Sequence, residues 1–181
     1  MKKEQRQREL MRSLELNPFA TDRELARLFQ VSVQTIRLDR LALGIPQVRE
    51  RVKQMAKEAY SRLKSLEARE LVGELIDIRL NQGGISLLDI DESMILTRSR
   101  IARGHYLFAQ ANSLAVAVID APVVLTGSAR VRYKRPVRLG ERVVAKAAVK
   151  VQRGNVYLIS VYSYVEQEIV FKGQFIVTVP K

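Results

Sequence analysis

The spacing of apolar residues changes near residue 70, and this change constrains the fold more than any other feature of the sequence. Before residue 70, apolar residues recur every three or four positions, which is the period of an amphipathic helix. After it, valine and isoleucine alternate with polar residues, as they do in strands with one buried face. We therefore expect an α+β protein with a helical unit at 1–45, an amphipathic linker helix at 46–70 and a second unit at 71–181.

The composition argues against several classes of protein. The 181 residues include no Cys and one His, so we expect no disulfide framework, no cysteine nucleophile and no metal site. No stretch reaches the roughly 20 apolar residues that span a bilayer, and the polar first residues do not resemble a signal peptide. We expect a cytoplasmic protein with no membrane partner. The net charge of +12 favours an anionic partner, and residues 1–70 and 71–181 each carry +6 of it.

A helix-turn-helix is expected within the first unit. Thr21 and Glu24 have the spacing of a capping box, so a short helix should begin there. Ser32 is a good N-cap for the next helix. We expect Leu28 in the first of these helices and Leu41 in the second to face the core.

The second helix of such a motif lies in the major groove of DNA, where Gln and Thr reach base edges and Arg binds guanine or phosphate. We expect five polar residues at its start and on its outer face to contact DNA: Ser32, Gln34, Thr35, Arg37 and Arg40. The alternative is a small helical cap whose charges are only solvated.

The apolar residues from Val48 to Leu66 predict a linker helix that runs to about Arg69. Leu63 and Leu66 lie at the end of its narrow apolar stripe. The stripe needs a partner, which is either the same helix of a second subunit or the second unit of its own chain.

The second unit has the element order of a hot-dog fold, in which a curled sheet wraps around a central helix. Two short strands precede one long apolar helix, and four long strands follow it. The expected ranges are 75–80 and 85–90 for the short strands, 101–119 for the helix, and 123–133, 142–151, 155–166 and 169–179 for the long strands.

Five segments together resemble a known family: SVQTIRLDRL (32–41), IPQVRERV (45–52), IARGHYLFAQANSLAVAVID (101–120), GERVVAKA (140–147) and EQEIVF (166–171). In this order, along nearly the whole chain, they resemble the FapR family of malonyl-CoA-responsive repressors of fatty-acid and phospholipid synthesis genes in Gram-positive bacteria. The resemblance implies a winged-helix-like, DeoR-type helix-turn-helix that binds a palindromic operator as a homodimer. It also implies a hot-dog domain, related to acyl-CoA thioesterases, that senses a ligand.

The resemblance implies an effector site as well. In the family, an arginine just before the Gly-His pair of the central helix binds the malonyl carboxylate, and this arginine corresponds to Arg103. Gly104 lies where the backbone approaches the thioester, and Asn112 corresponds to an asparagine that acts from the partner subunit. Leu96 replaces a phenylalanine that lines the acyl pocket in one branch. No cofactor is implied: malonyl-CoA is a regulatory ligand, and malonyl-acyl-carrier protein is a second candidate effector.

The alternative function is an acyl-CoA thioesterase with an appended helical domain. Thioesterases of this fold need a carboxylate near the central helix, but no Asp or Glu occurs between Glu92 and Asp120. His105 has no neighbouring carboxylate to orient it, and we interpret it as a packing residue. We therefore expect no catalytic residue and no enzyme activity, and Asp120 is the residue that would reverse this interpretation.

A basic run follows the central helix and includes Arg130, Arg132, Lys134 and Arg135. On a strand, the first three would share one face because side chains alternate. They would then suit either the phosphates of coenzyme A or a charged sheet edge that resists aggregation. The sequence leaves both interpretations open.

Overall fold

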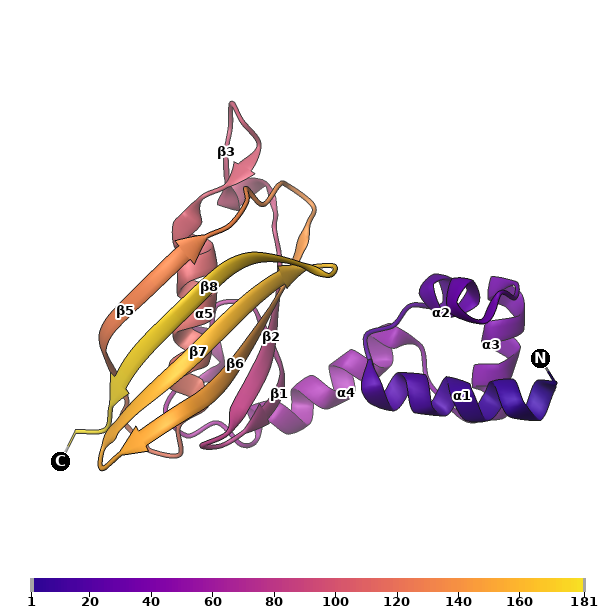
Figure 1. The fold of residues 1–181 in the computed structure, drawn as a ribbon, viewed down its shortest axis with the longest axis horizontal. Coiled ribbons are helices and arrows are strands. Elements are labelled where there is room, and N and C mark those ends of the chain that lie inside the picture. The colour runs from indigo at the N-terminus through magenta and orange to yellow at the C-terminus, as the bar shows by residue number, and fades with distance from the viewer. Residues whose placement is uncertain (1, 181) are drawn as a thin grey trace. The chain divides into compact units, whose positions relative to one another are not determined.

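The computed structural model describes residues 2–180 and divides the chain into two compact units, residues 1–55 and 56–181. Unit 1 is helical, and unit 2 is a curved antiparallel sheet packed against one long helix (Figure 1). No helix within 2–180 is long and apolar enough to cross a membrane.

Unit 1 packs three helices, α1 (Lys3–Leu16), α2 (Asp22–Phe29) and α3 (Val33–Ala42), around a small core. The expected capping box is present, because Thr21 N donates to Glu24 Oε2 at 2.6 Å and Glu24 N donates to Thr21 Oγ1 at 3.2 Å. The core consists of Leu10, Leu14, Ala20, Leu25, Ala26 and Ile36. Residues 2–55 contain no strand, so the helix-turn-helix lacks a wing.

Two expected core positions of unit 1 are wrong. Leu28 is 65% exposed and Leu41 is 72% exposed. A core closed by three short helices buries only one narrow face of each helix, and Leu25 and Ile36 occupy those faces. Leu28 and Leu41 lie outside that face and remain at the surface.

The linker helix is shorter than expected. Helix α4 spans Val48–Tyr60 and includes the boundary between the two units. After Tyr60 the chain turns, and the side chains at the end of α4 and in the segment that follows it contact the rest of unit 2. The Tyr60 hydroxyl accepts a hydrogen bond from Leu75 N at 3.1 Å, and Leu63 and Leu66 pack against the core of unit 2. Tertiary contacts therefore override the helical spacing, and a short 3₁₀ helix follows at Ala68–Glu70.

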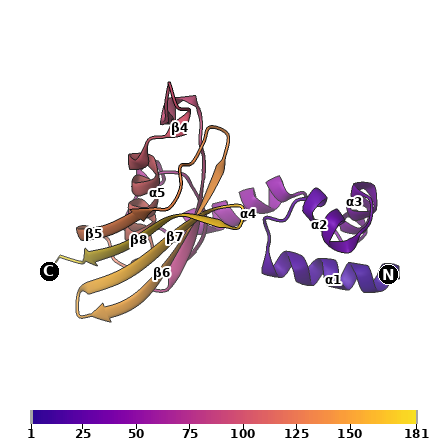
Figure 2. The ribbon, with the colours of Figure 1, turned by 45° about the horizontal axis from the view of Figure 1, so that its top comes forward.

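The sheet of unit 2 has six antiparallel strands in the order β1-β2-β6-β7-β8-β5. The hot-dog expectation is confirmed: helix α5 (Gly104–Ala117) lies against one face of the curved sheet (Figure 2). The strands are β1 (Glu74–Arg79), β2 (Gly83–Asp89), β5 (Leu125–Tyr133), β6 (Arg142–Arg153), β7 (Val156–Val165) and β8 (Glu168–Thr178). Strands β1 and β5 form the two edges.

Helix α5 is buried along most of its length, as its small residues predict. Ala111, Leu114 and Ala115 are each fully buried against the sheet. Gly84 on β2 allows this close approach, because a Cβ there would lie 3.1 Å from Val118 Cγ1 and 2.9 Å from Asp77 O.

The start of α5 differs from the expected position. Residues 101 and 102 belong to β4 (Ile101–Ala102), which pairs with β3 (Ile95–Leu96) after a 3₁₀ helix at Glu92–Met94. Ala102 N donates to Val137 O at 2.7 Å and Arg103 N donates to Met94 O at 2.8 Å. These bonds to distant carbonyls hold the chain extended, so the helix begins only at Gly104.

Candidate functional site

The candidate DNA-binding surface is the outer face of α3. Ser32 caps the helix, because its Oγ accepts a hydrogen bond from Thr35 N at 3.1 Å. Gln34 is exposed, and the side chain of Arg37 is 59% exposed with only a distant ion pair, 3.7 Å from Asp22. Ser32, Gln34 and Arg37 can therefore reach a groove, whereas Thr35 is half-buried and also contacts the Ser32 hydroxyl at 2.9 Å.

The expected DNA contact of Arg40 is corrected by the structure. Only 4% of its side chain is exposed, and Nε and Nη2 donate to the two carboxylate oxygens of Asp22 at 2.7 and 2.9 Å. Nη1 donates to Ile45 O at 2.9 Å. Arg40 follows Ile36 by four residues, and residues four apart share a helix face, so helix geometry alone places it beside the core.

The candidate effector site begins at Arg103, the residue before the first turn of α5. Its Nη2 donates to Ser93 O and, at 3.1 Å, to the Tyr106 hydroxyl, and the guanidinium carbon lies 5.1 Å from the centre of the Tyr106 ring. Its Nε is buried and has no hydrogen-bond partner among residues 2–180. A charged donor left without an acceptor costs free energy, so this atom indicates a missing acceptor.

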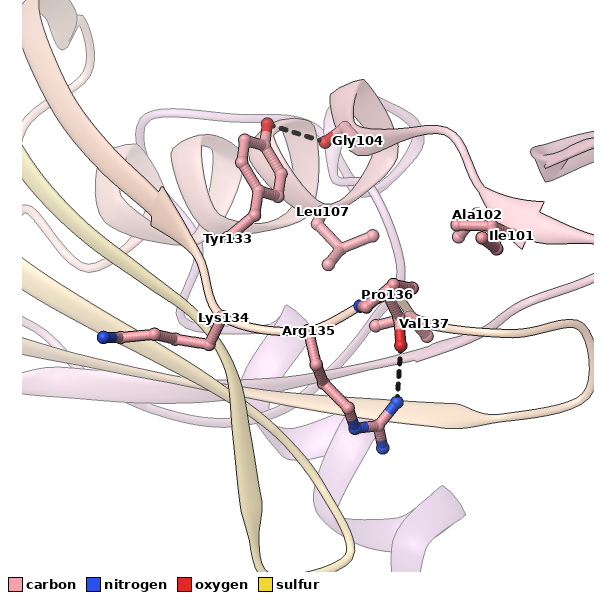
Figure 3. Close-up of a pocket in the computed structure, with 9 residues that line it drawn as sticks. All are labelled: Ile101, Ala102, Gly104, Leu107, Tyr133, Lys134, Arg135, Pro136 and Val137. Carbon is pink, nitrogen blue, oxygen red and sulfur yellow. Dashed lines mark hydrogen bonds between the residues drawn. The ribbon is translucent and has the colours of Figure 1, made fainter. Parts of the chain in front are cut away.

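A cavity of about 300 Å³ lies beside the start of α5 (Figure 3). The residues that line it come from β4, the start of α5, the end of β5 and the segment after β5: Ile101, Ala102, Gly104, Leu107, Tyr133, Lys134, Arg135, Pro136 and Val137. The Tyr133 hydroxyl donates to Gly104 O at 3.0 Å, and burial raises the pKa of this hydroxyl. A Cβ on Gly104 would lie 3.0 Å from the Tyr133 ring, so the close contact favours glycine. No local pattern in the sequence indicates the role of Tyr133.

Of the four expected effector residues, Gly104 lines the cavity, and Arg103 precedes it in the chain but is not among the lining residues. Leu96 is 52% exposed on β3 and is not among the lining residues. Asn112 lies on α5 beside the edge strand, where its Oδ1 accepts a hydrogen bond from Thr126 Oγ1 at 2.8 Å.

The basic run at residues 130–135 does not lie on one surface: Arg135 lines the cavity, whereas Arg132 lies on the opposite face of the sheet. Arg135 lines the cavity, but its side chain is occupied by Glu141 at 3.0 Å and Glu168 at 2.7 Å. Burial alone would raise the pKa of Glu141, but hydrogen bonds from Arg135 and from Arg138 N outweigh it and lower that pKa. Arg132 lies opposite Lys172 on the sheet, one residue before Tyr133, which faces α5. Because neighbours on a strand point to opposite faces, Arg132 points away from the cavity.

Acidic side chains lie outside the lining of this cavity. None of the nine lining residues is acidic. Asp120 follows the far end of α5, about 20 Å from Gly104 by the length of the helix, and forms an ion pair with Lys64 at 2.6 Å. Asp120 therefore does not line the cavity.

Comparisons with known proteins identify the family. No family model matches the chain. Proteins named Transcription factor FapR match it almost end to end: those of Caldanaerobacter subterraneus (51% identical, 96% of this chain and 87% of the relative), Halalkalibacterium halodurans (52%, 97% and 94%) and Bacillus cereus (51%, 96% and 89%).

Solved structures match unit 2 and show its fold. An uncharacterized protein from Pyrococcus horikoshii has a TM-score of 0.61 at 30% identity and covers 66% of this chain and 92% of its own. A virulence protein from Campylobacter jejuni has a TM-score of 0.63 at 20% identity, covering 68% and 96%. A Streptococcus mutans protein solved with acetyl CoA has a TM-score of 0.55 at 14% identity, covering 59% and 86%. With half of its residues identical to those relatives over nearly its whole length, this chain belongs to the FapR family of transcription factors.

Proposed function

We propose that this transcription factor represses fatty-acid and phospholipid synthesis genes, binds its operator as a homodimer, and is released from DNA by malonyl-CoA. The observation that carries the ligand part is the buried Nε of Arg103, which lacks an acceptor. A free carboxylate would supply that acceptor, and arginine binds carboxylates strongly. Malonyl-CoA has such a carboxylate and acetyl-CoA does not.

The start of α5 supports an anionic ligand independently. The first N–H groups of a helix have no partners within it and carry a partial positive charge. At α5 no side chain caps these groups and no acidic residue lies in the first turn. The cavity beside them is lined mostly by apolar side chains, which suits an acyl thioester. The same chemistry fits malonyl-acyl-carrier protein, because its acyl end is identical.

The edge strand β5 supports the homodimer. It is nine residues long, eight of them are exposed, and among residues 2–180 it is paired only with β8. Long exposed edges are templates for pairing with another chain, and Leu125 at 56% exposure gives this edge apolar surface to bury. Pairing of β5 with its copy would also bring Asn112 close to the partner subunit.

A gel-shift titration tests the proposal as a whole. Promoter DNA from a fatty-acid synthesis operon should be shifted by the protein and released by malonyl-CoA but not by acetyl-CoA. The acyl-CoA should stay intact in a thiol-release assay, because none of the residues that line the cavity carries a carboxylate. Release of free coenzyme A at an enzymatic rate would favour the thioesterase alternative instead.

Calorimetry tests the role of Arg103. A hydrogen bond to a charged group contributes about 1.5–3 kcal/mol, so wild type should prefer malonyl-CoA over acetyl-CoA by roughly ten- to a hundredfold. Arg103→Ala should lose this preference, whereas Arg98→Ala, an exposed arginine in the nearby β3–β4 turn, should keep it. Equal affinities of the wild-type protein for both ligands would contradict the proposal.

A further inference from the structure

The face of the sheet that points away from α5 carries a row of cations and tyrosines. Across four neighbouring strands, Lys146 on β6 lies opposite Tyr162 on β7, Tyr162 opposite Lys172 on β8, and Lys172 opposite Arg132 on β5. Residues paired across strands share a face. We call this row, with Arg130 and Tyr164 beside it, the basic band.

The neighbours of the row along each strand confirm which face it occupies. Ala145, Val161 and Phe171 each adjoin a member of the row, are fully buried, and belong to the core around α5. Because side chains alternate along a strand, the basic band lies on the opposite face from α5 and from the cavity. It therefore has no part in holding the effector within this subunit.

The charge of the basic band is not neutralised by carboxylates of residues 2–180. The Lys146 ammonium lies 5.6 Å from the centre of the Tyr164 ring, and the Lys172 ammonium lies 5.3 Å from that of Tyr162. None of the four cations pairs with a carboxylate of residues 2–180. Arg142, by contrast, is paired with Asp89 at 2.6 Å.

We propose that the basic band of unit 2 binds the phosphate backbone of duplex DNA near the operator. Lysine, arginine, glutamine and tyrosine side chains are the usual donors to DNA phosphates. Lys146 and Lys172 are two strands apart, about 10 Å by the strand spacing, so they can contact separate phosphates. The band places no helix in a groove, so its contribution is independent of base sequence.

Duplex DNA fits this face better than an acidic protein does, for two reasons. Unit 1 of the same chain carries the candidate recognition helix, so bound DNA would be present at high effective concentration, and a weak contact then adds substantially to overall binding. Residues 71–181 also carry +6, with 15 basic and 9 acidic side chains. Four of these cations belong to the band, on β5, β6 and β8, with the tyrosines of β7 between them, as suits a repeating phosphate backbone.

Salt dependence of DNA binding by the full-length protein tests the inference. Affinity for a duplex of unrelated sequence is measured between about 50 and 200 mM salt, where each phosphate contact contributes about 0.9 to the slope of log affinity against log salt. The double variant K146Q/K172Q should lower that slope by up to about 1.8 per protomer. The charge-preserving K146R/K172R should match wild type, which would tie any loss in K146Q/K172Q to the positive charge at these two positions.

The matched control is R98Q/R153Q, which removes two exposed arginines of unit 2 from outside the band, neither of which forms an ion pair within residues 2–180. An equal loss in R98Q/R153Q and K146Q/K172Q would mean that net charge alone matters and would overturn the inference. An unchanged slope in K146Q/K172Q would overturn it too. Arg37→Ala separates this inference from the proposed recognition helix, because it should weaken the preference for the operator while leaving the contribution of the band in place.

Discussion

At the scale of single residues, α3 shows how two arginines three positions apart can have different roles. Arg37 is mostly exposed, whereas Arg40 is buried against Asp22. Three residues turn a helix by about 300°, so the two side chains leave the axis in directions roughly 60° apart. That rotation is enough to move Arg40 from the surface to the margin of the core. Arg37 is therefore a candidate for DNA recognition, and Arg40 holds the helix-turn-helix together.

Arg40→Ala should destabilise unit 1 by roughly 3 kcal/mol, because it leaves the largely buried carboxylate of Asp22 with only the distant Arg37 as a partner. The substitution also removes the hydrogen bond to Ile45 O at the end of α3. Hydrogen exchange of the α2 and α3 amides would measure this loss.

Arg37→Ala is the matched control, since it removes an exposed arginine from the same helix. It should leave exchange unchanged and weaken operator binding by about 1–3 kcal/mol. If Arg40→Ala kept the stability of wild type and lost only DNA binding, Arg40 would be a DNA contact after all.

At the scale of elements, the buried carboxylate of Asp39 on α3 holds α1 in place through hydrogen bonds. Asp39 Oδ2 accepts a hydrogen bond from Arg6 Nε at 2.6 Å, and Oδ1 accepts one from Gln7 at 3.0 Å. Burial alone would raise the pKa of Asp39, but these hydrogen bonds and the charge of Arg6 outweigh burial and lower it. Asp39 therefore binds a proton less readily in the folded state than in the unfolded chain.

The sign of this shift gives a pH prediction. A lowered pKa stabilises the fold above the unfolded value of about 3.9, and the contribution is lost as the pH falls through the folded value. Hydrogen exchange of α1 should therefore show Asp39→Asn to be less protected than wild type at neutral pH. The difference should shrink well below pH 4, where both proteins lack the charge. A difference of the same size at both pH values would show that the charge of Asp39 contributes nothing.

Elements governed by local chemistry are also the ones that the sequence predicts well. The capping box at Thr21, the N-cap at Ser32 and the alternating strands are each set by residues close in the chain. The predicted length of the linker helix is wrong because Leu63 and Leu66 have helical spacing but pack on a core built from distant residues. Arg103 was found through a family resemblance. Its hydrogen bonds to Ser93 O and the Tyr106 hydroxyl, and the position of Tyr133, depend on contacts that no local pattern reveals.

At the scale of the whole molecule, the two ends of α5 contact different functional parts of unit 2. The N-terminal end lies at the cavity. The C-terminal end holds the segment that follows α4: Ser65 Oγ donates to Val116 O at 3.1 Å, and Lys64 pairs with Asp120 at 2.6 Å. Leu63 and Leu66 in the same segment pack against the core. A ligand that shifts α5 would therefore act directly on the segment that follows α4 in the chain.

This arrangement changes which element should carry the switch. Ligand and DNA must favour different states of the protein, and moving a population from 1:99 to 99:1 takes about 5.5 kcal/mol of differential binding. The coupling must then pass through the segment at 61–66, whose leucines are anchored on unit 2, rather than through a stripe on a longer helix.

The double variant Leu63→Ser with Leu66→Ser should bind malonyl-CoA nearly as well as wild type in calorimetry, because neither residue lines the cavity. Its DNA complex should respond much less to the ligand in a gel-shift titration, whereas Leu80→Ser, a half-buried leucine packed on the same core, should respond normally. If the double variant released DNA as sharply as wild type, the segment would be a passive tether and α5 would signal by another route.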